Sequence, residues 1–174
     1  MDEIVKAALA KWPNVPHCHG WLALDARGDW YMRDERIQAA GPFPRVKGSR
    51  IQHEKLLGFI HRNYGRDEAG AWFFQNGPQR VYVQLEAAPY VWRLARRGDG
   101  LEVRAHTGAE AQPRSAWLDE QGRLFLDTDL GFGLVHSLDM AEAAEAVERG
   151  QWRPEAMEFA AMPARFGYRL LPAP

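Results

Sequence analysis

Residues 71–86 read AWFFQNGPQRVYVQLE, and this stretch decides the fold class. Two runs rich in aromatic and β-branched residues flank Asn76-Gly77, a dipeptide typical of tight hairpin turns. Whether the loop is Asn76-Gly77 or spans residues 76–79, the same side chains share a face, because they alternate along each strand. One face is an apolar core wall, made of Trp72, Phe74, Val81, Val83 and Leu85. The other face mixes aromatic, amide and guanidinium groups, from Phe73, Gln75, Arg80, Tyr82 and Gln84. The stretch therefore predicts an antiparallel sheet.

Further strand-like runs lie on both sides of this hairpin and are separated by Gly, Pro and Asp residues. They cover residues 20–32, 90–96, 101–106, 115–118, 123–127 and 131–137. Two other segments, residues 2–11 and 139–149, have the spacing of short amphipathic helices. The chain thus combines many short strands with few helices.

A further helix is predicted over residues 50–64. Ser49 and Gln52 match a capping box, and Gly65 stands where a left-handed C-terminal cap belongs. Four apolar side chains then share one helical face, namely Leu56, Leu57, Ile60 and Tyr64. His53 falls near the middle of that face, so we expect it to be at least half buried.

These patterns predict one α+β domain over residues 1–174. We expect a curved, mainly antiparallel sheet of about eight strands, packed by two or three helices. A sheet of this size can close into a partial barrel, which would leave a concave side for a ligand.

The charge balance argues against nucleic acid as a partner. The chain carries 22 Lys and Arg residues against 23 Asp and Glu residues, a formal net charge of −1. Nucleic-acid binding depends on a basic footprint that neutralises phosphates. Seven Trp, eight Phe and five Tyr residues are many for this length, and they suit a sheet core, a binding groove or a homodimer interface.

The sequence favours a cytoplasmic protein. Cys18 is the single cysteine, so no intrachain disulfide forms, which fits a reducing compartment. The first residues, MDEIVKAALAKW, are not typical of a secretory signal, and no stretch reaches the roughly 20 apolar residues of a membrane span.

The tip of the hairpin at residues 71–86 is the first candidate site. Asn76, Gln79 and Arg80 gather there beside the rings of Phe73 and Tyr82. A guanidinium group can stack on either ring or pair with a carboxylate. The tip therefore predicts a site for a small anionic ligand.

A basic loop is the second candidate site. Arg45, Lys47 and Arg50 surround the predicted start of the helix at residues 50–64, and helix starts bind anions through free N–H groups. The glycines of a phosphate-binding P-loop are missing.

His17-Cys18-His19 is the third candidate. In an extended segment both imidazoles point to one side and Cys18 to the other, so they could share a divalent metal. A third ligand would come from elsewhere in the chain, from His53, His106, His136 or an acid. The spacing alone supplies too few ligands, so we expect no cofactor and keep the metal as the alternative.

No catalytic motif is present. The chain has no Gly-x-Ser-x-Gly elbow and no dinucleotide fingerprint, and nothing places two carboxylates across a substrate. The sequence leaves the function unknown and favours a non-enzymatic binding or accessory module for a small anionic ligand or a protein partner. The alternatives are a metal-dependent enzyme with a His17/His19 centre and a structural homo-oligomerisation domain.

Four stretches of the chain carry a resemblance to a family. The WPNVP and GWL residues at 12–16 and 20–22, together with FIHRNY at 59–64 and WFFQNGPQRVYV at 72–83, resemble an uncharacterised proteobacterial family of unknown function. The resemblance covers about half of the chain. It implies a bacterial cytosolic protein and assigns no catalytic residue.

Overall fold

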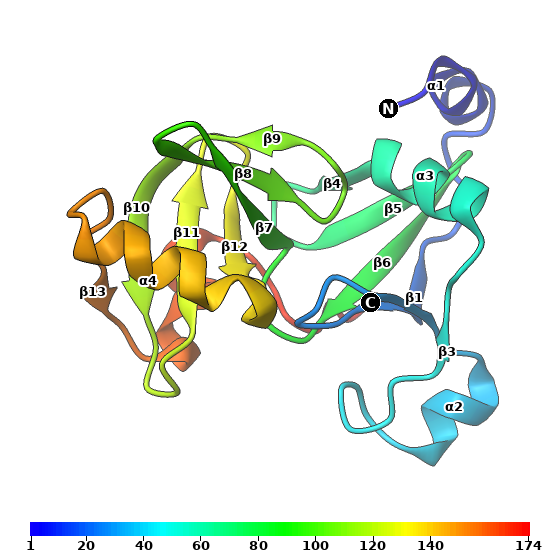
Figure 1. Cartoon of the computed structure of the whole chain (residues 1–174). Helices are drawn as coiled ribbons and strands as arrows, with labels where there is room; N and C mark the ends of the chain where they lie inside the picture. The colour runs from blue at the N-terminus through cyan, green and yellow to red at the C-terminus, as the bar shows by residue number, and fades with distance from the viewer. The chain divides into compact units, whose positions relative to one another are not determined.

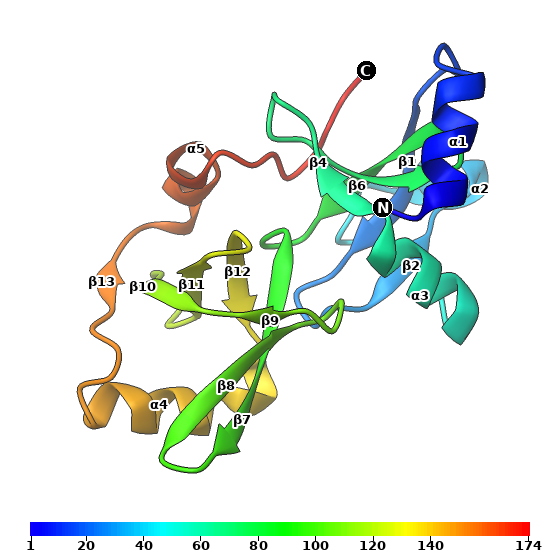
Figure 2. The same cartoon turned by 90° about the horizontal axis from the view of Figure 1, so that it is seen from above.

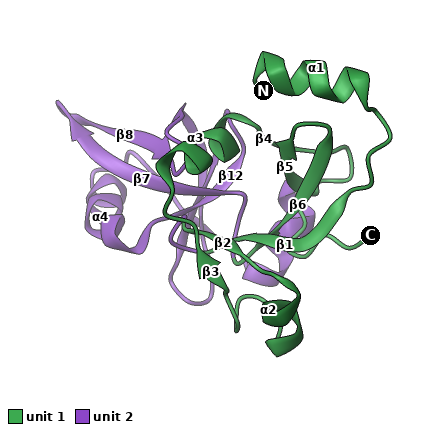
Figure 3. Ribbon diagram, turned by 90° about the vertical axis from the view of Figure 1, so that its right-hand side faces the viewer, with its two compact units in different colours: residues 1–25, 29–86, 167–174 green, residues 26–28, 87–166 purple.

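The structure, a computed structural model, describes residues 1–174 (Figures 1 and 2). It divides into two compact units. The first unit holds residues 1–25, 29–86 and 167–174, and the second holds residues 26–28 and 87–166 (Figure 3). That the whole chain folds as one domain stays a prediction.

The first unit is built on a six-stranded sheet with the order β3-β2-β1-β6-β5-β4. All its neighbouring strands are antiparallel except β1 and β6, which are parallel. Its elements are α1 (Glu3–Lys11), β1 (Cys18–Leu24), β2 (Trp30–Met32), α2 (Glu35–Ala40), β3 (Ser49–Arg50), α3 (Glu54–Arg62), β4 (Tyr64–Arg66), β5 (Trp72–Asn76) and β6 (Gln79–Leu85). The helix predicted over residues 2–11 is α1.

The predicted hairpin forms β5 and β6, and the predicted assignment of side chains to its two faces is confirmed. Asn76 pairs with Gln79 and Phe74 pairs with Val81, so Gly77 and Pro78 form a two-residue loop. Gly77 begins this loop with a φ of 57°, a conformation that glycine adopts without strain.

The mixed face of this hairpin is also buried. Phe73 and Tyr82 are 5% and 7% exposed and pack together with Ala71. The rings are covered because Arg80 lies over Phe73 and His19 stacks on Tyr82. The mixed face is therefore a second packed layer.

The helix predicted over residues 50–64 is shorter than expected. Ser49 pairs with Met32 in β3, so it caps no helix. α3 begins at Glu54, where Nδ1 of His53 accepts a hydrogen bond from the Leu56 N–H. As a cap, His53 is exposed, and the expectation that it is half buried is wrong.

The second unit is built on a seven-stranded sheet with the order β13-β10-β11-β12-β7-β8-β9. Only the pairs β10–β13 and β12–β7 are parallel. Its elements are β7 (Tyr90–Arg97), β8 (Gly100–Ala105), β9 (Glu110–Ala111), β10 (Pro113–Leu118), β11 (Leu124–Thr128), β12 (Phe132–Val135), the 3₁₀ helix η1 (Ser137–Asp139), α4 (Met140–Glu148), β13 (Glu155–Ala156), the 3₁₀ helix η2 (Phe159–Ala161) and α5 (Met162–Phe166). The helix predicted over residues 139–149 is α4.

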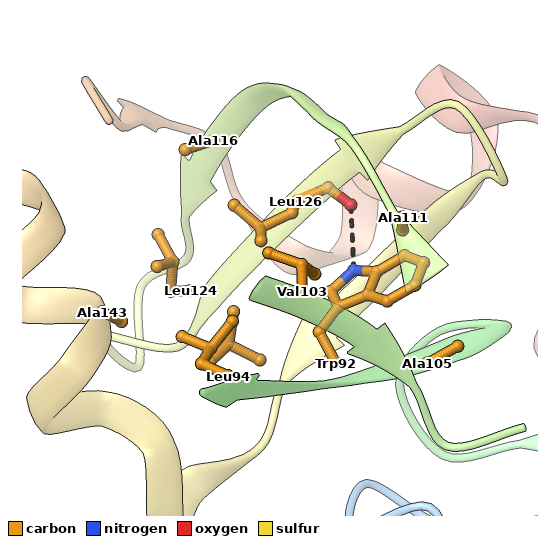
Figure 4. Packing of buried hydrophobic residues seen from close by; sticks show 10 residues of the cluster. Trp92, Leu94, Val103, Ala105, Ala111, Ala116, Leu124, Leu126 and Ala143 are labelled. Atoms are coloured by element: carbon orange, nitrogen blue, oxygen red, sulfur yellow. Dashed lines mark hydrogen bonds between the residues drawn. The ribbon is translucent and has the colours of Figure 1, made fainter. Parts of the chain in front are cut away.

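Trp92 lies in the core of the second unit and is fully buried (Figure 4). Its indole N–H donates to the carbonyl of Leu126 at 3.2 Å. Leu94, Val103 and Ala143 pack in the same cluster, so α4 contributes to the core of this unit.

The α+β class with antiparallel-rich sheets is confirmed, but the sheet count is not. The chain has two sheets of six and seven strands in place of one sheet of about eight, and neither is a closed barrel. It has five α-helices, more than the two or three expected, because α2 and α5 are too short to leave a periodic pattern. No helix has the length and apolar character needed to cross a membrane.

Candidate functional site

Tyr82 lies at the centre of the candidate site, in β6 of the first unit. Its phenol O–H donates to Oδ2 of Asp67 at 3.0 Å. Asp67 follows β4, and its other carboxylate oxygen accepts from the Ala71 N–H at 2.9 Å. Burial by itself would raise the pKa of Asp67, but these hydrogen bonds outweigh it and hold the pKa below its usual value. Asp67 thus stays ionised and fixes the phenol.

Two histidines of β1 and its approach lie against the Tyr82 ring. The His19 ring stacks on it with 4.6 Å between centroids, and His17 meets it edge-on at 5.6 Å. Cys18 pairs with Val81, so the residues on either side of Cys18 share the face of Tyr82. Burial, and then the charge of His17, lower the pKa of His19, which favours its neutral form.

Arg80 lies two residues before Tyr82, on the same face of β6. Its guanidinium is 4.4 Å from the centre of the Phe73 ring, and Phe73 meets Tyr82 edge-on at 5.9 Å. Its charge helps to lower the pKa of Asp67, yet the two side chains form no ion pair. Arg80 therefore has donors left for a ligand.

The other two residues of the predicted hairpin-tip site have different surroundings. Gln79 donates from its side-chain amide to the carbonyl of Pro16 at 3.1 Å, which ties the hairpin to the segment before β1. Asn76 is exposed at the end of β5. We name His17, His19, Asp67, Arg80 and Tyr82 the Tyr82 site.

Two hollows open at the Tyr82 site. One of about 210 Å³ is lined by His17, His19, Asp67 and Tyr82, together with residues near the C-terminal end. A more open one of about 500 Å³ is lined by Arg80 and by residues 66–69. Both include Asp67, so the structure brings the predicted histidine pair and the predicted arginine to one place.

The predicted metal ligands do not come together as a set. His17 and His19 both contact the Tyr82 ring, one edge-on and one stacked, whereas His53 caps α3. No group of three or more His, Cys, Asp or Glu side chains is placed to hold a metal ion. The chain therefore offers at most an imidazole pair at this position.

The basic loop lacks the helix start that was expected to accompany it. Arg50 lies in β3 and pairs with Asp29 at 2.7 Å. Lys47 contacts the carboxylates of Asp25 at 2.9 Å and Glu86 at 3.4 Å. Arg45 is exposed. The charges of Lys47 and Arg50 are thus matched by carboxylates within the protein.

Sequence reasoning missed two residues. Asp67 closes the turn over residues 67–71 through its own N–H and carboxylate, and an Asp three residues before a Gly is a typical turn signal that could have indicated it. Arg33 is 2% exposed and donates to Oε1 of Gln84 and to the carbonyl of Gly41, and no local pattern marks it as buried.

The chain belongs to a family of unknown function. The family model DUF2944, described as "Protein of unknown function (DUF2946)", matches residues 1–173. The resemblance to an uncharacterised family is confirmed to this extent. No curated protein matches the chain.

Two solved structures share the fold. A DUF1285 family protein from Shewanella baltica OS155 has a TM-score of 0.50 and 16% identity, with 72% of this chain and 91% of that chain covered. A DUF1285 family protein from Silicibacter pomeroyi DSS-3 has a TM-score of 0.50 and 15% identity, with 82% and 83% covered. At this identity the likeness concerns the fold alone.

Proposed function

We propose that the protein is a non-enzymatic binding module whose Tyr82 site takes a small ligand with a carboxylate or phosphate group. The observation that carries the proposal is the placement of Arg80, which is held over Phe73 without an ion pair and beside an open hollow. A guanidinium offers paired donors that match the oxygens of such anions.

The stack of His19 on Tyr82 adds a recognition surface for the rest of the ligand. Both residues line the hollow of about 210 Å³, and their rings stack with 4.6 Å between centroids. In its neutral form, the His19 ring can donate or accept a hydrogen bond without adding charge. The site thus suits an anion joined to a flat or apolar body.

The alternatives remain open to test at the same place. A divalent metal would use His17 and His19, with the remaining ligands supplied by solvent or by the bound molecule. A protein partner or a second copy of the chain could also cover this surface. We further propose a cytoplasmic bacterial protein, which the single free Cys18 supports.

Native mass spectrometry of gently purified, untagged protein tests the proposal. We expect an added mass that disappears on denaturation and is absent from the Arg80→Gln variant. Arg36→Gln is the matched control, because Arg36 is exposed on α2 and lines neither hollow of the Tyr82 site. An added mass that Arg80→Gln retains would contradict the proposal.

The same measurement separates the alternatives. An added mass equal to a divalent metal, lost in His17→Gln and His19→Gln, would favour the metal centre. A doubled mass at low protein concentration would favour the homodimer. Thermal unfolding of Arg80→Gln shows whether the loss of its packing on Phe73 has changed the fold.

A further inference from the structure

A groove of about 660 Å³ lies within the second unit, between β8 and β10. Its walls include Leu101 of β8, Ser115 of β10 and the segment over residues 150–153 that follows α4. Figure 2 shows β8 and the β9–β10 stretch meeting near the β8–β9 turn and diverging from it. The volume lies within the roughly 300–1,000 Å³ typical of ligand sites.

The groove is bordered by two strand edges that no other strand covers. β9 pairs with Val103 and Arg104 of β8 and leaves the first half of β8 paired only with β7. On β10, β13 pairs with Trp117 and Leu118 and leaves Pro113, Ser115 and Ala116 paired only with β11, with a register irregularity at Arg114. A strand edge of this kind presents backbone N–H and C=O groups to any chain that lies beside it.

Gln112 explains why the two strands separate. It joins β9 to β10, and its N–H donates to Oδ1 of Asp129 at 2.7 Å. Its carbonyl accepts from the Asp129 N–H at 3.2 Å. These bonds hold the chain against the turn between β11 and β12, so β10 follows β11 and leaves the edge of β8 open.

The side chains around the groove combine an aromatic wall with unpaired positive charge. Trp152 is half buried and packs against the core of the unit. Arg114 and Arg153 are exposed and form no ion pair with a carboxylate, and Glu155 is the one acidic residue of the lining. The groove therefore favours an occupant that carries negative charge.

We propose that this groove binds an extended segment of a partner protein, which adds as a strand to the open edge of β10 and places an acidic side chain beside Arg114 or Arg153. Strand addition uses backbone hydrogen bonds for affinity and side-chain contacts for specificity, and both are offered here. The proposal is independent of the Tyr82 site, since every residue involved belongs to the other unit.

Selection from a displayed random heptapeptide library on the immobilised full-length chain provides the test. We expect the selected peptides to be rich in β-branched residues and to carry Asp or Glu. Synthetic copies should bind the Arg114→Glu/Arg153→Glu variant roughly tenfold more weakly or worse, because each reversal sets like charges against each other. Arg36→Glu, a charge reversal on exposed α2, should leave the affinity unchanged.

N-methylation of the selected peptide, one amide at a time, tests the binding mode. Strand addition predicts that binding is lost at every second amide, because alternate amides face the edge of β10. Both arginines are exposed, so thermal unfolding of the double variant should match that of the parent chain.

Three results would overturn the proposal. One is that no peptide is enriched on the parent chain over the double variant. Another is that N-methylation shows no alternation. The third is that adenosine diphosphate, a small probe with an aromatic ring and an anionic group, binds in a manner lost in Trp152→Ala and displaces the peptide, which would assign the groove to a small molecule.

Discussion

The indole Nε1 of Trp30 donates a hydrogen bond to Nε2 of His61, with 3.0 Å between the two nitrogens. Trp30 is 1% exposed in β2, and His61 belongs to α3, so the bond joins helix and sheet of the first unit. An Nε2 that accepts a hydrogen bond carries no proton, so this imidazole is neutral in the folded chain.

We expect this pair to make stability depend on pH. Burial lowers the pKa of His61 below its usual value of 6.5, so the unfolded chain binds more protons than the folded chain once the pH falls to that region. The contribution of neutral His61 to the free energy of unfolding should therefore be complete above about pH 7 and be lost as the pH falls from 6.5 through the pKa that His61 has in the folded chain.

Urea unfolding measured between about pH 8 and about pH 5 checks this prediction. His61→Gln keeps an acceptor for the indole but cannot take up a proton here, so its unfolding free energy should vary less with pH. The lowered pKa of His19 acts in the same direction, so part of the dependence should remain. A pH dependence identical in His61→Gln and the parent chain would refute the prediction.

Gly133→Ala should destabilise the second unit. A Cβ at Gly133 would lie 2.4 Å from Nε1 of Trp92 and 2.8 Å from Cβ of Tyr90. Trp92 is fully buried and hydrogen-bonded to Leu126, so it cannot move aside. We expect a loss of about 1–3 kcal/mol or more in the free energy of unfolding.

Gly100→Ala is the matched control for this variant. Gly100 is exposed at the start of β8, and a Cβ there would meet nothing closer than 3.8 Å. Chemical denaturation of both variants, followed by tryptophan fluorescence, gives the comparison. Equal stability of Gly133→Ala and the parent chain would show that the Trp92 core can repack.

Asp139→Ala should also destabilise the second unit, through two neighbours that lose their acceptor. Asp139 is 6% exposed, accepts from the Leu94 N–H at 2.9 Å and forms a bidentate pair with Arg93 at 2.6 and 3.0 Å. Leu94 is buried, so its N–H would be left without a partner, at a cost of about 1–3 kcal/mol. Arg93→Gln should cost less, because the Arg93 side chain is 52% exposed.

The pH dependence of the parent chain provides the second measurement for Asp139. Burial works against ionisation, but the bonds from Arg93 and Leu94 lower its pKa below 3.8. The stabilising effect of ionised Asp139 should be present above pH 3.8 and be lost as the pH falls through the pKa of Asp139 in the folded chain. This pH range lies well below the one in which His61 titrates. An acid transition unchanged in Asp139→Ala would contradict this assignment.

Local patterns were enough to predict the hairpin but not the whole sheet. The turn and the alternation of residues 71–86 alone determine which side chains of β5 and β6 share a face. The start of α3 does not, because Ser49 has the side chain of a cap but is held in β3 by pairing with Met32. That pairing is a long-range contact, and a capping motif carries no information about it.

The site shows the same division between local and long-range information. The hairpin-tip arginine and the histidine pair were each predicted from local spacing, as two separate sites. They lie together because β1 is parallel to β6, with Cys18 opposite Val81. A parallel pairing between segments about sixty residues apart leaves no mark in either segment, so their convergence on Tyr82 could not be read from the sequence.

Tyr82→Phe tests whether the Tyr82 site is held in place by the phenol–carboxylate bond. The variant keeps the ring, so the stack with His19 and the contact with Phe73 should remain. It removes the O–H that donates to Oδ2 of Asp67, and we expect a loss of about 1–2 kcal/mol in the free energy of unfolding. The pKa of Asp67 should rise, because one of the bonds that lower it is gone.

Titration of the Asp67 carboxyl by NMR in the parent chain and in Tyr82→Phe measures this shift directly. Arg80→Lys is the companion variant, since it retains the nearby positive charge and leaves the phenol in place. If the pKa of Asp67 is the same with and without the Tyr82 hydroxyl, the backbone N–H groups of Ala71 and Ala69 fix this carboxylate, and the hollow beside His17 and His19 is then held by ring packing.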